Sequence, residues 1–260
     1  ATGEVECIQS VRRLIKQGAD FIKITATGGS TVTSLPYRPS FTKQEIQSIT
    51  DEAHKMGKHV AAHCTSSQGI INALDSGVDT IIHGYHLDSD GTFNYQPGIT
   101  EKFIEKGVFL NPTIYQARKT IKVLESKQDQ GTLTQMEREN LETSRDKIEK
   151  VAEIVSKMVS EGVKLVCGSD ASWTYYKTGD FQSEISAHVS VGLSPIEAIV
   201  SATKDSAKSC WIDDKVGTLS ENKIADILVV DGDPTQDINN LRNVVAVISN
   251  GELVDRENLI

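Results

Sequence analysis

Five times along this chain a helical pattern ends on a glycine and a short apolar run follows at once. The runs are ADFIKI, KHVAAH, VDTIIH, VFLNPT and VKLVCGSD, which follow Gly18, Gly57, Gly77, Gly107 and Gly162. Glycine just past a helix end takes the left-handed cap conformation, and runs rich in Val and Ile with few charges are typical of strands buried on both faces. The repeat therefore predicts an α/β chain with a parallel sheet.

Two regions depart from this repeat. From about Gln116 to Ser160 the chain is highly charged and free of proline, and we expect a helical hairpin inserted after the fourth run. From about Val216 the chain changes to short strand-like pieces separated by turn residues, IADILVVDGDP and VVAVISNGELV. We therefore expect an α/β domain over residues 1–213 and a second, small all-β element over residues 214–260.

The number of runs is small for a closed barrel. A closed (β/α) barrel has eight strands and takes about 250 residues for the barrel alone. This chain of 260 residues offers five runs, because the charged segment and the C-terminal β element occupy the rest. We expect three strand–helix units of such a barrel to be missing at the N-terminal side.

Composition excludes several classes of partner. With 27 basic and 36 acidic residues the net charge is −9, which lacks the basic field that nucleic-acid binding needs. No apolar run approaches the roughly 18 residues of a membrane span, and the first residues do not form a signal-peptide pattern. The four cysteines are scattered without a CxxC pair, so neither a disulfide framework nor a thiolate zinc knot is indicated. We expect a cytoplasmic protein with no nucleic-acid or membrane partner.

Polar side chains that suit metal binding stand at the ends of four runs. Lys23 falls five residues after its glycine, His63 and His83 six after theirs, and Asp170 eight after Gly162. Functional groups gather at the carboxyl ends of parallel strands. Taken singly, each residue has an ordinary explanation, such as a strand-end lysine or a hydrogen-bonded core histidine. Burying the set costs several kcal/mol unless the groups pair or bind a cation, and His with Asp suits zinc, so the pattern predicts a metal site.

Five further residues are candidates for substrate contact. Gly28 and Gly29 follow the first run and would let the backbone approach a ligand, although a loop turn explains them equally well. His86 follows the third run closely, and a surface-loop histidine is the simpler interpretation. Tyr115 and Arg118 come just after the fourth run, where an arginine fork suits a substrate carboxylate and a helix surface is the simpler alternative.

Six stretches, in order, resemble successive blocks of the amidohydrolase superfamily, specifically its Xaa-Pro dipeptidase and zinc carboxypeptidase-like branch, which is related to imidazolonepropionases. They are GADFIKITATGG, DEAHKMGKHVAAHC, SGVDTIIHG, EGVKLVCGSDA, LSPIEAIVSATKDSAK and VGTLSENKIADILVVDGDP. The resemblance runs over nearly the whole chain and is weakest between about Gln116 and Ser160. It implies α/β architecture with a TIM-like (β/α) barrel of the metal-dependent hydrolase type over residues 1–213, incomplete at the N-terminus. Over residues 214–260 it implies part of a small β-sandwich, the C-terminal β element of a composite sandwich domain.

The resemblance also implies a role for each residue of the predicted metal site. Lys23 matches the family's fourth-strand lysine, which is often carboxylated to a carbamate that bridges two metals. His63 and His83 match the fifth- and sixth-strand histidines that ligate the second metal. Asp170 matches the eighth-strand aspartate, which ligates the first metal and carries a proton from the attacking water to the leaving amine. The implied cofactors are one or two divalent ions, Zn²⁺ first, and a CO₂-derived carbamate on Lys23.

One part of the family pattern is missing. The first strand of the family carries a His-x-His pair for the first metal, and none of the six histidines here has that spacing. We expect that strand and the next two to belong to an N-terminal portion that this chain lacks.

Three functions compete. The leading one is a metal-dependent amidohydrolase that cleaves the amide or peptide C–N bond of a dipeptide or N-acyl amino acid with an activated water. The second is a cyclic C–N hydrolase or deaminase of imidazolonepropionase type, against which Lys23 argues, because those enzymes usually have one metal and no lysine bridge. The third is an inert fragment, or a subunit that needs a partner supplying the His-x-His strand, because an open barrel edge exposes unpaired backbone. The expected partner is a small-molecule or dipeptide substrate. The sequence is also compatible with a homo-oligomer.

Overall fold

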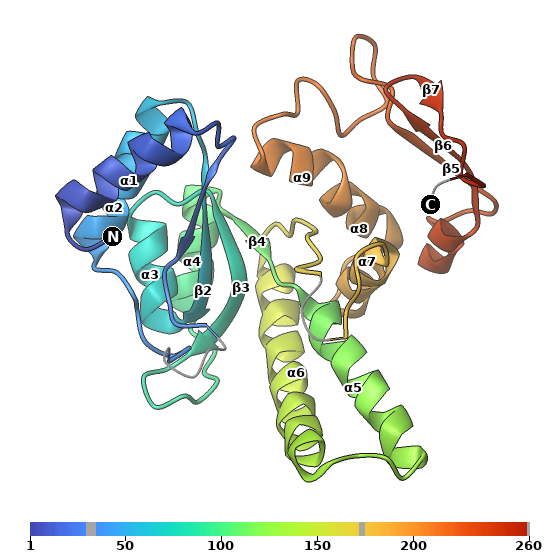
Figure 1. The fold of residues 1–260 in the computed structure, drawn as a ribbon, viewed down its shortest axis with the longest axis horizontal. Helices are drawn as coiled ribbons and strands as arrows, with labels where there is room; N and C mark the ends of the chain where they lie inside the picture. Colours follow the sequence, from blue (N-terminus) through green and yellow to red (C-terminus); the bar gives the residue numbers. More distant parts are fainter. Residues whose placement is uncertain (30–34, 172–174, 259–260) are drawn as a thin grey trace. The chain divides into compact units, whose positions relative to one another are not determined.

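The computed structural model describes residues 1–29, 35–171 and 175–258, and the chain divides into two compact units (Figure 1). Unit 1 comprises Ala1–Thr113 and Asp146–Leu165. Unit 2 comprises Ile114–Arg145 and Val166–Ile260.

Unit 1 is built on a four-stranded parallel sheet with the order β1-β2-β3-β4. The predicted parallel sheet is confirmed for four of the five runs, and the fifth makes only an isolated parallel bridge, between Leu110 and Leu165. All five glycines that precede the runs have positive φ, as their cap positions require. The strands are β1 (Ile22–Thr25), β2 (Val60–Ser66), β3 (Thr80–Leu87) and β4 (Phe109–Asn111).

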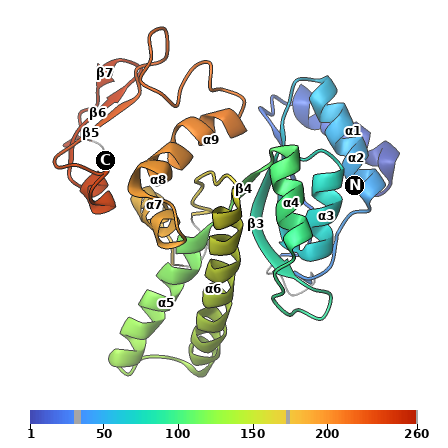
Figure 2. The same ribbon diagram turned by 180° about the vertical axis from the view of Figure 1, so that it is seen from behind.

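Helices α1 to α4 lie on one side of this sheet in both views (Figures 1 and 2). The Thr42 side chain accepts from the Glu45 backbone and the Glu45 side chain from the Thr42 backbone, so α2 begins with a capping box. Apolar side chains of the helices and of β3 are fully buried, including Ile46, Ile70 and Ile81. The helices are α1 (Glu4–Lys16), α2 (Lys43–Lys55), α3 (Ser67–Asp75) and α4 (Pro97–Lys106).

The charged segment forms two long helices, α5 (Ile114–Asp129) and α6 (Gln135–Glu161). Within unit 2 they are joined by a small apolar cluster of Leu124, Leu133 and Leu141. An ion pair between Arg145 and Glu125, 2.6 Å apart, adds to it. The C-terminal part of α6, from residue 146 onward, belongs to unit 1.

The remainder of unit 2 combines three helices with a small antiparallel sheet in the order β5-β6-β7. Cys167, Ile185, Ala198, Ile238 and Leu241 form its core cluster. The two C-terminal pieces thus do form strands. The elements are α7 (Phe181–Ser190), α8 (Pro195–Ala202), α9 (Lys204–Ser209), β5 (Ile227–Val230), the 3-10 helix η1 (Ile238–Arg242), β6 (Val244–Ser249) and β7 (Glu252–Leu253).

Two findings concern the chain as a whole. Within the described ranges, no helix has both the length and the apolar character that crossing a membrane requires. All four cysteines are free thiols, and only Cys210 is exposed.

Candidate metal centre

Lys23 and His63 lie on the same face of the sheet. In β1 the buried Ile22 and Ile24 alternate with the exposed Lys23 and Thr25. The ladder pairs Lys23 with Ala61 and Thr25 with His63. Because paired residues of neighbouring strands point to the same side, the register places the amine and this imidazole on one face.

His83 reaches His63 only because its strand leaves regular geometry. The ladder pairs His63 with Ile82 and Cys64 with His83, so strict alternation would put the two imidazoles on opposite faces. His83 instead has a left-handed φ of 76°, followed by Gly84 at 66°, and the register shifts just after this point. The two rings meet edge to face with their centroids 4.5 Å apart.

A backbone carbonyl sets the tautomer of His63. Its Nε2 lies 3.3 Å from the Gly28 carbonyl oxygen. A carbonyl can only accept, so Nε2 carries the hydrogen, and in the neutral ring Nδ1 keeps the lone pair. The hydrogen bond therefore prepares Nδ1 of His63 as a metal ligand.

A threonine hydroxyl orients His83. Nδ1 of His83 lies 2.8 Å from Oγ1 of Thr113, which follows β4 by two residues, and the Tyr85 hydroxyl lies 3.4 Å away. When Nδ1 donates to Thr113, Nε2 keeps the lone pair. Burial, together with the charges of His63, Lys147 and Lys23, holds the pKa of His83 well below its ordinary value. The ring is therefore neutral, which is the form that binds a metal.

These donors fit a divalent ion such as zinc. The two imidazoles meet edge to face, and in each a hydrogen bond at one ring nitrogen favours a lone pair on the other, as metal-binding histidines require. Lys23 is close enough for its charge to lower the pKa of His83. Over the described residues, no three His, Cys, Asp or Glu side chains are grouped to hold an ion. In unit 1 the donor set therefore consists of the His63–His83 pair and the amine of Lys23.

Three of the predicted residues have strained backbones. His83, His86 and Asp170 have φ of 76°, 53° and 48°, where residues with side chains are uncommon, and Thr113, the hydrogen-bond partner of His83, has a φ of 51°. Such strain persists where the surroundings enforce it, and it gathers at functional sites. Asp170 is the last residue of the fifth run and belongs to unit 2.

The interpretation of His86 as a surface-loop histidine is wrong. Strand β3 continues to Leu87, so His86 is part of it and is 0% exposed. Its ring stacks on Tyr95 at a centroid distance of 5.6 Å, and its Nδ1 accepts from the Gln96 backbone. Burial lowers the pKa of His86 to about 4, so the side chain is neutral.

The two predicted glycines differ in their surroundings. A Cβ on Gly28 would lie 2.1 Å from the Leu35 carbonyl oxygen, so close backbone packing requires glycine there. A Cβ on Gly29 would have nothing within 4 Å.

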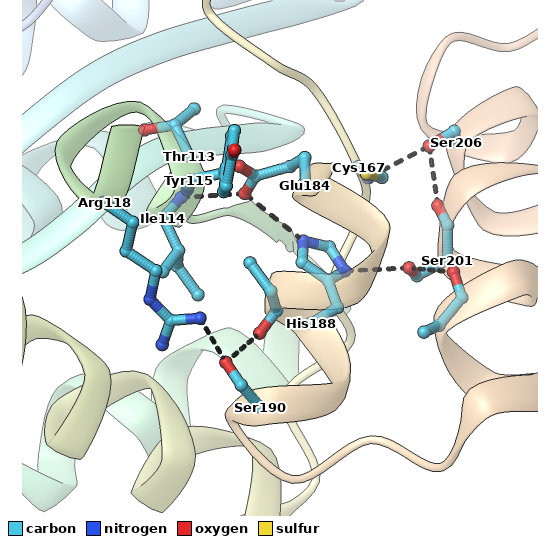
Figure 3. A network of polar contacts seen from close by, with 12 residues as sticks. Thr113, Ile114, Tyr115, Arg118, Cys167, Glu184, His188, Ser190, Ser201 and Ser206 are labelled. Atoms are coloured by element: carbon cyan, nitrogen blue, oxygen red, sulfur yellow. Dashed lines mark hydrogen bonds and ion pairs between the residues drawn. The ribbon is translucent and has the colours of Figure 1, made fainter. Parts of the chain in front are cut away.

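Tyr115 and Arg118 lie at the start of α5, in unit 2. Nη1 of Arg118 donates to the Ser190 hydroxyl over 2.6 Å (Figure 3). The Tyr115 ring meets Tyr176 edge to face at 5.2 Å. Both side chains are half-buried, and their role in substrate binding stays a prediction.

The sequence interpretation missed a buried acid, Glu184 of α7. Its carboxylate is 0% exposed and accepts from the backbone N–H groups of Ile114 and Tyr115, each over 2.7 Å (Figure 3). One helical turn later, Nε2 of His188 lies 3.8 Å from Oε1 of Glu184. Nδ1 of His188 lies 2.9 Å from the Ser201 hydroxyl. The signal was an acid and a histidine four residues apart, and so on one helix face, in the stretch SEISAHVS.

Glu184 gives a testable pH dependence. Burial, with the nearby charge of Asp170, raises its pKa to about 7 against the backbone hydrogen bonds and Arg118, which lower it. The folded state therefore keeps this proton at pH values where the unfolded chain has lost it. The contribution of Glu184 to the free energy of unfolding is complete below about pH 4.5 and is lost as the pH rises to about 7, a change of roughly 3 kcal/mol.

The comparison of wild type with Glu184→Gln isolates this effect, because the buried histidines titrate in both proteins. We expect the stability advantage of wild type over the variant to shrink by roughly 3 kcal/mol between pH 4.5 and 7, measured by urea denaturation. Parallel stability curves for the two proteins would contradict the raised pKa.

The comparisons with known proteins agree on one family. The model of the amidohydrolase family matches residues 1–254. A curated relative, ochratoxinase of Aspergillus niger, is 26% identical over 247 residues, which cover 92% of this chain and 46% of that protein.

Solved structures show the same likeness. A Xaa-Pro dipeptidase with bound methionine in the active site superposes with a TM-score of 0.81 at 30% identity, covering 98% of this chain and 59% of that one. A putative prolidase from Bifidobacterium longum has a TM-score of 0.79 at 28% identity and covers 97% and 60%. The chain thus spans about half of the curated relative and about three fifths of these structures. With the family model matched over almost its whole length, the chain belongs to the amidohydrolase family.

Proposed function

We propose that this protein is a metal-dependent hydrolase that cleaves the amide or peptide C–N bond of a dipeptide or N-acyl amino acid. The His63–His83 pair carries the proposal, because the two imidazoles meet at a centroid distance of 4.5 Å beside Lys23. Family membership and the likeness to a Xaa-Pro dipeptidase support the reaction class. The TIM-like barrel, the composite sandwich and the cytoplasmic location stay predictions from the sequence.

The proposed ligands are Lys23, His63, His83 and Asp170. At such a site one or two divalent ions, Zn²⁺ first, supply Lewis acidity and an activated water. His63 would bind through Nδ1 and His83 through Nε2, the ring nitrogens that their hydrogen bonds leave with lone pairs. The Asp170 carboxylate takes a proton from the water and returns it to the departing nitrogen. The role of Asp170 is supported by its place at the end of the fifth run and by the family pattern.

Lys23 is proposed to act as a carbamate. A protonated amine has no lone pair for a metal, whereas addition of CO₂ to the neutral amine, with loss of one proton, gives an anion with two ligand oxygens. The positive charge of Lys147, which acts on His83 as that of Lys23 does, favours this anion over the ammonium form.

Carbamate formation predicts that metal loading depends on CO₂. After metal removal, reconstitution with Zn²⁺ and bicarbonate is expected to restore more bound zinc and more activity than Zn²⁺ in CO₂-free buffer. A carbamate signal in ¹³C NMR with labelled bicarbonate is the second measurement. The variant Lys23→Ala is expected to show neither response. Equal zinc content and activity with and without bicarbonate would contradict the proposal.

The third alternative, a chain that needs a partner, is favoured by one observation. None of the six histidines of this sequence stands in a His-x-His pair. Peptidase activity that appears only after mixing with a polypeptide carrying a His-x-His strand would support this alternative. Activity of the protein alone would exclude it.

A further inference from the structure

Three lysines of the C-terminal part of α6 lie over aromatic rings, one in β3 and two in the loop that follows β3. The Lys147 amine lies 4.7 Å from the Tyr85 ring centroid, Lys150 lies 5.9 Å from Phe93, and Lys157 lies 4.2 Å from Tyr95. All these residues belong to unit 1. Cation–π contacts explain why this charged helix packs against the aromatic side chains.

Lys147 differs from Lys150, which lies one turn further along the helix. Lys150 has a carboxylate partner, Asp146, at 2.8 Å. Lys147 is in none of the ion pairs found among the described residues, although it is half-buried. Burial lowers the pKa of its amine, which reflects the cost of desolvating a charge without a counter-ion. An anion would offset that cost.

Tyr85 contacts both the Lys147 amine and a proposed metal ligand. Tyr85, which is 8% exposed, contacts Lys147 with its ring face, and its hydroxyl lies 3.4 Å from Nδ1 of His83. The rings of His83 and Tyr85 have centroids 5.3 Å apart. The charge of Lys147 also contributes to the lowered pKa of His83, which places the amine within electrostatic reach of the centre.

The substrate class supplies a matching anion. In a dipeptide or N-acyl amino acid, the carbon of the terminal carboxylate is two bonds from the scissile nitrogen. When the scissile carbonyl lies at the metal ligands, this carboxylate must therefore lie beside them. A cation next to a ligand histidine, with no carboxylate of its own, is the complement that such a substrate requires.

We propose that Lys147 binds the terminal carboxylate of the substrate and so selects substrates with a free carboxylate. This inference rests on the proposed function. It differs from the sequence prediction that Arg118 holds the carboxylate, because Arg118 donates to Ser190 and interacts with Glu184 in unit 2.

The experiment compares an N-acyl amino acid with its C-terminal amide in the full-length, metal-loaded enzyme. The variant Lys147→Met keeps the apolar stem and removes the charge. We expect it to lower the ratio of kcat/KM for the acid to that for the amide by about 10- to 100-fold, the range for one charged hydrogen bond. Lys147→Arg is expected to restore most of this ratio. Lys150→Met, one turn further on α6, is the matched control and is expected to leave the ratio at the wild-type value.

Calorimetric titration with the free amino acid product and its amide gives a second readout without turnover. We expect Lys147→Met to weaken binding of the acid and not that of the amide. An unchanged acid-to-amide ratio in Lys147→Met and Lys147→Arg, or a loss of the ratio in Arg118→Met and not in Lys147→Met, would overturn the proposal. If wild type cleaves neither compound, the proposed function fails instead. In that case the calorimetric titration still tests whether Lys147 binds the carboxylate. Equal binding of the acid by wild type and Lys147→Met would overturn that role.

Discussion

Replacing His83 by asparagine is expected to remove most of the bound metal and to lower kcat/KM by about 10³-fold or more. Loss of a ligand forfeits several kcal/mol of transition-state stabilisation, and 1.36 kcal/mol corresponds to a factor of ten. Asparagine is chosen because His83 has a φ of 76°, which asparagine tolerates better than alanine. The variant therefore keeps the backbone and loses the imidazole. Metal content by mass spectrometry and steady-state kinetics are the measurements.

Two controls separate ligation from packing. Thr113→Val keeps the imidazole and removes the hydroxyl that lies 2.8 Å from Nδ1 of His83, so we expect metal affinity to fall by about 10- to 100-fold. His86→Asn changes a second buried β3 histidine with left-handed φ and is expected to retain the metal. Wild-type zinc content in His83→Asn, or equal metal loss in His83→Asn and His86→Asn, would contradict the ligand role.

The second large effect is expected for Asp170→Asn, which should lower kcat by about 10³-fold or more while the fold is retained. General acid–base catalysis alone contributes about 10²- to 10⁴-fold, and a ligand is lost as well. Asparagine again suits the left-handed φ of 48°. Single-turnover kinetics and circular dichroism measure the two parts of this prediction.

A substrate with a good leaving group isolates the proton transfer. A nitroanilide departs with little need for protonation, so the loss caused by Asp170→Asn is expected to be smaller on the anilide than on an alkyl amide. Wild-type turnover of the alkyl amide by Asp170→Asn would refute the role of Asp170. An equal loss of kcat on the anilide and on the alkyl amide would show that Asp170 binds the metal and does not transfer the proton.

The sheet could be predicted because its signals are local. A glycine cap and a β-branched run specify helix, stop and strand within about ten residues, and four runs pair as expected. The fifth run has the same local pattern and makes a single bridge, Leu110 to Leu165. Periodicity contains no information on how far two strands pair, because pairing depends on distant neighbours.

The candidate site could be predicted only in part, because its geometry also depends on contacts between distant parts of the chain. Register and alternation place Lys23 and His63 on one face. The approach of His83 depends on a left-handed φ and a register shift, which an alternating pattern cannot predict. His86 was misplaced because β3 extends beyond the apolar run, and Glu184 was missed because burial of an acid depends on tertiary packing.

Diffraction data collected on both sides of the zinc absorption edge, from crystals grown with zinc and bicarbonate, would locate the metal. We predict an anomalous peak about 2.0–2.1 Å from Nδ1 of His63 and Nε2 of His83, with a carboxylated Lys23 and the Asp170 carboxylate as further ligands. A peak bound to other side chains, or none near the two imidazoles, would contradict a metal centre at these residues.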